Sequence, residues 1–131
     1  MLYLREKSFD RTNTENIISL IEKESETEKP ENLYCIACGN YVTSIRFSIN
    51  PDGLHEHHFT NPAGFSYTIA CFKEAAGCES FGDLTEEFTW FPGYKWNYGI
   101  CTGCRMHLGW KYESSTDTFY GLIKGKLSPF A

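Results

Sequence analysis

The chain has 131 residues, which is enough for one domain with one hydrophobic core. Its formal net charge is −5 at pH 7 and its Lys and Arg residues are scattered, so we expect no nucleic-acid partner. The first residues lack the apolar stretch of a signal peptide, and no segment is apolar for long enough to span a bilayer. We therefore expect a cytoplasmic protein without a membrane partner.

Residues 1–30 differ in composition from the rest, because they are rich in Glu, Lys, Thr and Ser and nearly free of aromatic residues. Thr12 and Glu15 fit a capping box, and isoleucine and leucine residues follow at helical spacing. This pattern predicts an N-terminal leader over 1–30 that contains one short amphipathic helix, with a partly ordered leader as the alternative. Pro30 marks the boundary to a single domain over 31–131.

From Leu33 onward, short β-prone runs alternate with turn residues. The spacing predicts one helical turn over 73–76. Many short strands at close spacing indicate a mostly β, antiparallel domain. The predicted strands are 41–49, 57–59, 65–72, 88–90, 94–100, 107–112 and 118–123.

Four of the six cysteines form two Cys-x-x-Cys pairs, Cys35 with Cys38 and Cys101 with Cys104. Two such pairs supply the four thiolates that zinc prefers in closed structural sites, and cysteines in a reducing compartment favour metal over disulfides. We predict one structural Zn²⁺ that ties the two ends of the β domain together. A catalytic zinc would need an open position, and a redox role would leave the second pair unexplained.

The residues after each pair differ, since Gly39 can adopt a positive φ whereas Arg105 could do so only with strain. Cys71 lies in an apolar run and is interpreted as a buried small hydrophobe, while Cys78 could be an exposed thiol. His55 and His57 could form half a metal site on a strand. Because no third ligand is apparent nearby, surface or hydrogen-bonding histidines are the favoured interpretation of the His55–His58 cluster.

The three tryptophans, Trp90, Trp96 and Trp110, are concentrated in the second half of the chain. A Pro-Gly turn brings the first two close together, and Trp110 and Tyr112 share one face of a strand. The alternative is an ordinary core, because Trp is often buried. Three clustered indoles with few polar neighbours nevertheless favour an aromatic box around a flat or cationic guest.

These segments, the turn at 61–64, the two cysteine pairs and the tail at 119–122 resemble the CULT domain family in order and spacing. The family includes the thalidomide-binding domain of cereblon and single-domain bacterial relatives. The resemblance covers roughly residues 33–127. It implies a β-tent, in which two antiparallel sheets meet at a steep angle with the zinc near their junction.

The resemblance also implies a ligand. Trp90, Trp96 and Trp110 would surround the ring of a cyclic imide, such as a glutarimide, a succinimide, a uracil-like ring or the cyclised end of a damaged peptide. Tyr112 would close the floor. A small neutral ring suits such a pocket, whereas the ring-opened acid would place a charge against apolar walls.

The imide's polar edge would be met by backbone groups at Phe88 and by the indole N–H of Trp90, and Asn61 would lie in a loop beside the ligand. Phe88 replaces a His of the vertebrate pattern, which changes the pocket rim. The role of a ubiquitin-ligase adaptor is not implied, because a leader of about thirty residues cannot supply the further domains it needs.

Three rival functions remain at this stage. The first is an aromatic cage for a methylated ammonium group, with Glu86 and Glu87 as nearby counter-charges. The second is a structural zinc module for protein–protein interaction. The third is an enzyme related to the B-type methionine sulfoxide reductases, but their nucleophile is a cysteine on a late strand and none follows Cys104. We expect a binding module and not an enzyme.

Overall fold

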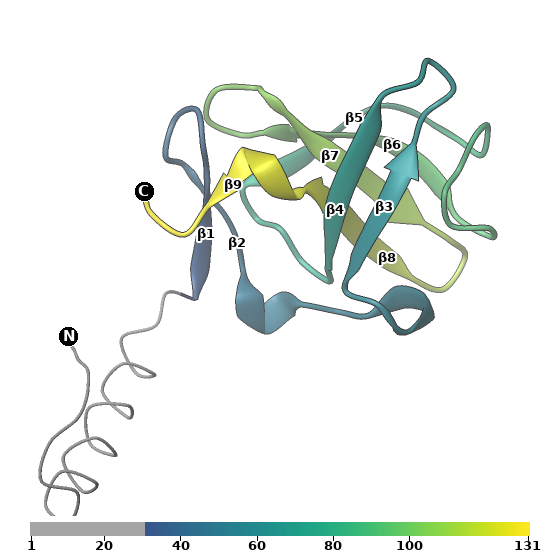
Figure 1. The fold of residues 1–131 in the computed structure, drawn as a ribbon, viewed down its shortest axis with the longest axis horizontal. Helices are drawn as coiled ribbons and strands as arrows, with labels where there is room; N and C mark the ends of the chain where they lie inside the picture. Colours follow the sequence, from purple (N-terminus) through teal and green to yellow (C-terminus); the bar gives the residue numbers. More distant parts are fainter. Residues whose placement is uncertain (1–30) are drawn as a thin grey trace, which may run out of the picture. The chain divides into compact units, whose positions relative to one another are not determined.

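Nine strands and three short 3₁₀ helices make up the part of the chain that the structure, a computed structural model, describes, residues 31–131 (Figure 1). The predicted leader and its helix lie outside the described residues. The strands are β1 (Asn32–Cys35), β2 (Tyr41–Ser44), β3 (Glu56–Thr60), β4 (Ser66–Phe72), β5 (Cys78–Thr85), β6 (Lys95–Cys101), β7 (His107–Glu113), β8 (Thr118–Ile123) and β9 (Leu127–Ser128). The 3₁₀ helices are η1 (Ile45–Phe47), η2 (Pro51–Gly53) and η3 (Lys124–Lys126).

The strands form two antiparallel sheets, which confirms the predicted mostly β fold. The smaller sheet has the order β2-β1-β9 and the larger one β3-β4-β8-β7-β6-β5. Every pairing between named strands is antiparallel. Because β9 pairs with β1, the two ends of the described domain lie side by side (Figure 1).

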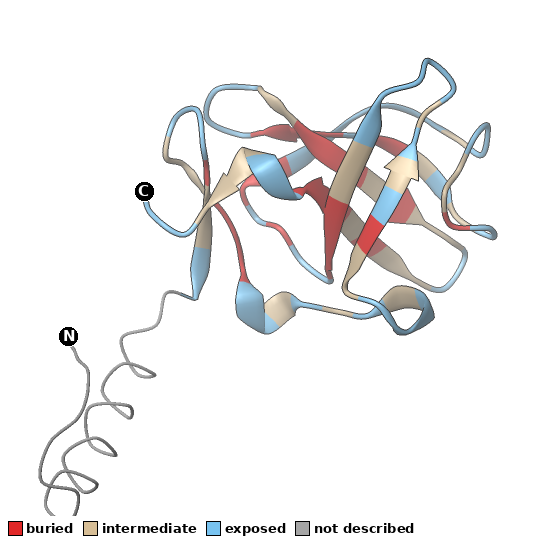
Figure 2. Cartoon of the chain, viewed as in Figure 1, coloured by how far each residue is buried: buried red, intermediate tan, exposed pale blue. Residues whose placement is uncertain are grey.

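The larger sheet is buried on both faces near its middle, where alternate residues enter two different hydrophobic clusters (Figure 2). On β4, Ala70 and Phe72 join the cluster that contains Cys35 and Cys101, whereas Ile69 and Cys71 join the cluster that contains Trp110. This division follows from the period of two along a strand. The second cluster forms the base on which the aromatic pocket described below is built.

One predicted strand and one predicted helical turn differ from the structure. The strand predicted over 41–49 stops at Ser44, and η1 follows. Phe47 and Ile49 then bond to β4 and to the residue that follows it, through Lys73 N–H to Phe47 O at 2.7 Å and Ile49 N–H to Cys71 O at 3.1 Å. The helical turn predicted over 73–76 is absent from the structure.

Strand β5 was not predicted from the sequence. It lies at the edge of the larger sheet, most of its residues are exposed, and its apolar residues Cys78, Phe81 and Leu84 are three apart, so it shows neither an apolar run nor a period of two. The helices among residues 31–131 are single 3₁₀ turns, and none is long and apolar enough to cross a membrane.

Candidate functional site

The four predicted metal ligands come together where the two sheets meet, since β1 belongs to the smaller sheet and β6 to the larger one. Cys35 ends β1 and Cys101 ends β6, while Cys38 and Cys104 lie in the turns that follow. Their sulfur atoms all lie within 4.8 Å of one another, with Sγ separations of 3.7 Å for Cys35–Cys104 and 3.6 Å for Cys38–Cys101. A tetrahedral ion bound at about 2.3 Å would separate its sulfurs by about 3.8 Å. The cluster can therefore hold one metal ion.

The two cysteine turns have the same backbone structure. In the first, Cys35 N–H donates to Asn40 O at 2.8 Å and Gly39 N–H donates to Cys35 O at 2.8 Å. In the second, the N–H of Cys101 donates to Met106 O at 2.8 Å and that of Arg105 donates to Cys101 O at 2.9 Å. The repeated turn requires a positive φ at the residue after each pair, which is 78° at Gly39 and 66° at Arg105. Arg105 thus takes a conformation that strains a residue with a Cβ.

The surroundings of Cys101 differ from those of the two cysteines outside the cluster. Burial raises the pKa of Cys101, but the N–H groups of Cys104 and Gly103 offset this and bring its pKa down to about 7, which favours the thiolate. Burial raises the pKa of both Cys71 and Cys78 to about 12. Cys78 is only 5% exposed, so the expectation that it could be an exposed thiol is wrong.

The histidine cluster makes hydrogen bonds, as its favoured interpretation predicted. His55 Nδ1 lies 3.0 Å from Ile49 O and His57 Nε2 lies 2.8 Å from Leu54 O, so both ring nitrogens donate to backbone carbonyls. His58 Nδ1 pairs with the Thr68 hydroxyl at 2.8 Å. In residues 31–131 the four-cysteine cluster is the only group with metal-binding geometry.

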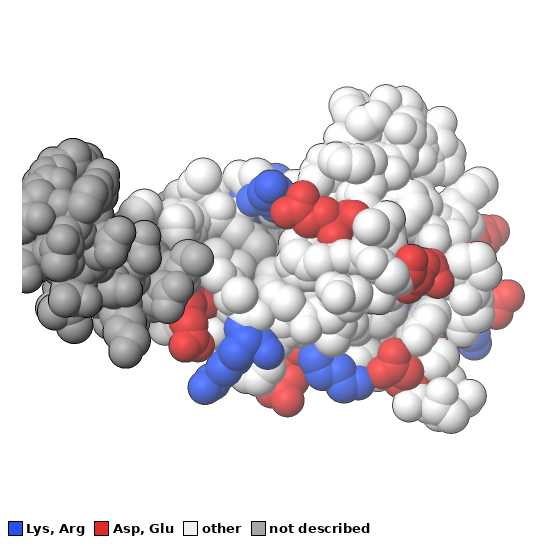
Figure 3. All heavy atoms as spheres, turned by 60° about the horizontal axis from the view of Figure 1, so that its bottom comes forward, with Lys and Arg blue, Asp and Glu red and all other residues white. Residues whose placement is uncertain are grey.

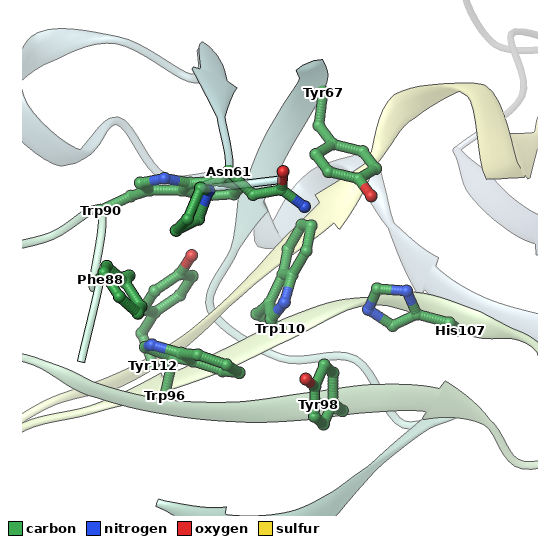
Figure 4. A pocket seen from close by; sticks show the side chains of 10 residues that line it. Asn61, Tyr67, Phe88, Trp90, Trp96, Tyr98, His107, Trp110 and Tyr112 are labelled. Carbon is green, nitrogen blue, oxygen red and sulfur yellow. The ribbon is translucent and has the colours of Figure 1, made fainter. Parts of the chain in front are cut away.

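A cavity of about 240 Å³ brings together all six residues that were predicted to bind the ligand (Figure 4). Two of its sides come from the β3–β4 hairpin and from the loop between β5 and β6, and the remainder comes from β6 and β7. Its lining is mostly aromatic. The lining residues are Asn61, Pro62, Tyr67, Phe88, Trp90, Trp96, Tyr98, His107, Trp110 and Tyr112.

Trp90 and Trp110 form one corner of the pocket and are fixed from behind by the β3–β4 hairpin. The two indoles meet edge to face, with centroids 5.0 Å apart and planes at 74°. Phe59 stacks on Trp90 at 4.7 Å and 11°, and Tyr67 meets Trp110 edge-on at 5.2 Å. Phe59 and Tyr67 are direct cross-strand partners in the β3–β4 hairpin. This single residue pair therefore packs against both tryptophans. Neither Phe59 nor Tyr67 was predicted from the sequence to belong to the site.

The rim beside Trp96 is a loop, and the strand predicted over 88–90 is wrong. Phe88 has a φ of 58° and is 69% exposed, so its backbone turns away from any sheet. The Trp96 indole N–H donates to Glu87 O at 2.8 Å and fixes the loop from below. Phe88 lines the pocket, and within residues 31–131 no protein group bonds its N–H or C=O; these two groups are called the open backbone edge of Phe88 below.

His107 and Tyr98 also line the pocket and were not predicted as site residues. A register shift between β6 and β7 lies beside Leu108, so His107 and Trp110 face the same side although their spacing is odd. His107 Nε2 donates to Gly109 O at 2.8 Å, and burial lowers the pKa of His107. The imidazole is therefore neutral near pH 7.

Fold and site together define a small β domain with four clustered cysteines that can hold one metal ion and with an aromatic pocket. The chain is similar to cereblon. It is 30% identical to "Protein cereblon" of Drosophila grimshawi over 132 aligned positions, which cover 92% of this chain and 20% of that protein. It is 26% identical to the Drosophila melanogaster protein, with 92% and 22% coverage, and 32% identical to the Gallus gallus protein over 76 positions, with 54% and 17% coverage.

No protein-family model matches the chain. The chain spans about a fifth of the length of the cereblons it matches, so the similarity concerns one part of those proteins. The chain thus contains a cereblon-like domain, with four clustered cysteines and a pocket lined by aromatic residues.

Proposed function

We propose that this domain is of the CULT type and that it binds a cyclic imide in the tryptophan cage formed by Trp90, Trp96 and Trp110. One structural Zn²⁺ would occupy the cysteine cluster. The observation that carries the proposal is the open backbone edge of Phe88, which lies at the rim of a pocket lined by three indoles. The similarity to cereblon over most of the chain supports it.

The polar groups at this rim match the edge of an imide. The C=O of Phe88 can accept from the imide N–H, and the Phe88 N–H can donate to one imide carbonyl. The indole N–H of Trp96 is already used by Glu87 O, whereas no protein acceptor among the described residues takes that of Trp90. Trp90 can therefore donate to the second carbonyl while its ring packs on the ligand.

The size and charge of the pocket favour a small neutral ring. A cavity of about 240 Å³ is below the range of about 300–1,000 Å³ that is usual for drug-sized ligands. No Lys or Arg lines it, and His107 is neutral near pH 7. A ring-opened acid would place a carboxylate among apolar groups without a partner, so the closed ring should bind better.

The rival functions have less support. A cage for a methylated ammonium group would gain from a carboxylate, but no Asp or Glu lines this pocket. Catalysis by a cysteine or serine nucleophile is not supported, because the pocket lining contains neither residue. On the face shown in Figure 3, basic side chains alternate with acidic ones, so no basic patch that would suit nucleic acid is seen there.

The direct test is calorimetric titration of the metal-loaded protein with glutarimide, its ring-opened acid and tetramethylammonium. We expect saturable binding of glutarimide alone. Trp90→Ala should weaken it by about tenfold or more, because it removes both a ring contact and an N–H donor. Phe81→Ala is the matched control, since Phe81 is an exposed aromatic residue of β5 outside the pocket.

The proposal fails if glutarimide does not bind or if only the cation does. An equal loss of glutarimide affinity in Trp90→Ala and Phe81→Ala would also contradict the proposal, because binding would then not depend on the tryptophan cage. A thermal melt of each variant distinguishes loss of the pocket from loss of the fold.

A further inference from the structure

A hydrogen bond between side chains joins the two cysteine turns, residues 35–40 and 101–106. Asn40 Nδ2 donates to Thr102 Oγ1 at 2.9 Å, although the two residues are 62 positions apart in the sequence. The same amide nitrogen also donates to Tyr41 O at 3.1 Å, which helps to fix the Asn40 side chain. Among residues 31–131, and apart from the contacts between cysteine sulfurs, no other hydrogen bond links the two turns.

The backbone of Gly77 holds both partners of this bond in place. Thr102 N–H donates to Gly77 O at 3.0 Å, and Gly77 N–H donates to Val42 O at 3.0 Å. A Cβ at Gly77 would collide with Tyr41 O, so the start of β2, which follows Asn40 directly, packs closely on this residue. Asn40 and Thr102 are therefore brought together by protein contacts that need no metal ion.

Gly103 lets the two turns approach each other closely. A Cβ added at Gly103 would lie 3.1 Å from Asn40 Cβ and 3.1 Å from Cys38 Sγ, which is closer than ordinary van der Waals contact. Only a residue without a side chain fits here without displacing its neighbours. The second turn thus lies directly against the residue that donates the hydrogen bond and against one of the metal ligands.

The same contact lies on the solvent side of the cysteine cluster. Cys38 and Cys104 are exposed, whereas Cys35 and Cys101 are buried. A competing chelator therefore reaches the cluster from the side of Cys38 and Cys104. Because Cys38 belongs to the first turn and Cys104 to the second, moving the two turns apart would separate these two thiols.

We propose that Asn40 is a positioning residue of the metal site, and that its hydrogen bond to Thr102 holds the two cysteine turns together and slows the loss of the ion. This inference rests on the proposed Zn²⁺ in the cysteine cluster and concerns residues that do not bind the ion. Groups that fix metal ligands from outside the coordination sphere change metal affinity when they are removed. Here the group fixes the distance between two pairs of ligands.

The rate of zinc transfer from the loaded whole chain to an excess of a chromogenic pyridylazo chelator measures the effect. Thr102→Val removes the acceptor and keeps a branched side chain, and we expect it to release zinc about three- to fivefold faster. Thr102→Ser keeps the hydroxyl and should restore most of the slow release. Thr60→Val is the matched control, because it removes an exposed side-chain hydrogen bond, Thr60 to Ser66 at 2.8 Å, in the β3–β4 hairpin.

The variant Asn40→Ala tests the same bond from its donor. It should speed release at least as much as Thr102→Val, and adding Thr102→Val to it should have no further effect, because the bond is already absent. Additive effects of the two substitutions overturn the inference, since the residues would then act separately. Should Asn40→Ala fail to fold, the comparison of Thr102→Val with Thr102→Ser decides.

The unfolding rate of each loaded variant, followed by tryptophan fluorescence, separates positioning from a loss of the fold. We expect it to stay at the wild-type value. An equal acceleration of unfolding and zinc release in Thr102→Val overturns the inference, because the ion would then leave through unfolding. Release from Thr102→Val at the wild-type rate, or at the same raised rate as from Thr60→Val, also overturns it. A wild-type chain that holds no zinc contradicts the proposed metal site itself.

Discussion

The indole nitrogen of Trp96 donates a hydrogen bond of 2.8 Å to the backbone carbonyl of Glu87, across the turn that carries Phe88 and Trp90. This bond fixes the rim of the pocket from the strand below it, because Trp96 belongs to β6. The open backbone edge of Phe88 is therefore held in place by a residue of the cage itself.

Replacing Trp96 by Phe keeps an aromatic side but removes this donor. We expect affinity for glutarimide to fall about three- to tenfold, because Glu87 O loses its partner and the Phe88 edge is no longer fixed. Calorimetry on Trp96→Phe and the wild type measures the change. Unchanged affinity would show that the hydrogen bond does not position the rim.

The parts of the fold that depend on local sequence were predictable. Each Cys-x-x-Cys pair forms its turn by itself, so spacing alone indicated the ligands Cys35 and Cys101, and strong alternation or apolar runs indicated β4, β7 and β8. The three tryptophans and Tyr112, which the family resemblance grouped at one site, line one cavity, and their role in binding stays a prediction.

The parts that depend on distant contacts were not predictable. Strand β5 owes its conformation to pairing with β6, and its mostly exposed residues show no period of two. The bulge at Leu108 puts His107 on the same face of the sheet as Trp110. Strict alternation along the strand would place these two side chains on opposite faces. Phe59 supports Trp90 from another hairpin, and a local pattern contains no information on that contact.

The metal site gives a prediction about stability. In the proposed zinc site one ion would link the two cysteine turns, so removing it with a chelator should lower the melting temperature by more than about 10 °C. Native mass spectrometry should show one zinc per chain before chelation and none after. A melt that chelation does not change would contradict a structural role.

Thiol reactivity provides a related but separate prediction. Burial raises the pKa of Cys71 and Cys78 to about 12, so both should resist iodoacetamide at pH 7 in the folded protein. Peptide mass mapping after a short pulse measures the labelling of each cysteine, and denatured protein gives the fully labelled control. Fast labelling of Cys78 in the folded state would show that β5 opens.

Asp117 gives a prediction on pH dependence. Lys73 Nζ and the Tyr94 hydroxyl each donate to its carboxylate at 2.7 Å and hold the pKa of Asp117 below its usual range. The folded state therefore favours the charged form, so this stabilisation is present above the unfolded pKa of about 3.9 and is lost as pH falls through the folded pKa.

Asp117→Asn should lower the free energy of unfolding at pH 7 by less than about 1 kcal/mol, because the pair is partly exposed. The difference between variant and wild type should shrink below about pH 4. Urea unfolding at pH 7 and at pH 3 measures both values. A difference that is constant across this range would show that the charge of Asp117 contributes nothing.

Arg105 offers a route to a more stable domain. It occupies, with a φ of 66°, the position that Gly39 fills in the first cysteine turn, and a residue with a Cβ in this region costs about 1–2 kcal/mol. Arg105→Gly relieves that strain, although glycine also gains entropy in the unfolded chain. The substitution removes one exposed ion pair, Arg105 to Glu79 at 3.8 Å, which contributes little.

We expect Arg105→Gly to raise the melting temperature by about 3 °C, from a net gain of about 0.5 kcal/mol. Arg105→Ala is the matched control, because it removes the same ion pair and keeps the Cβ, and it should leave the melting temperature unchanged or lower it. If the two variants melt at the same temperature, the left-handed backbone at Arg105 stores no strain. A higher melting temperature for the glycine variant alone would assign the gain to the backbone of the second cysteine turn.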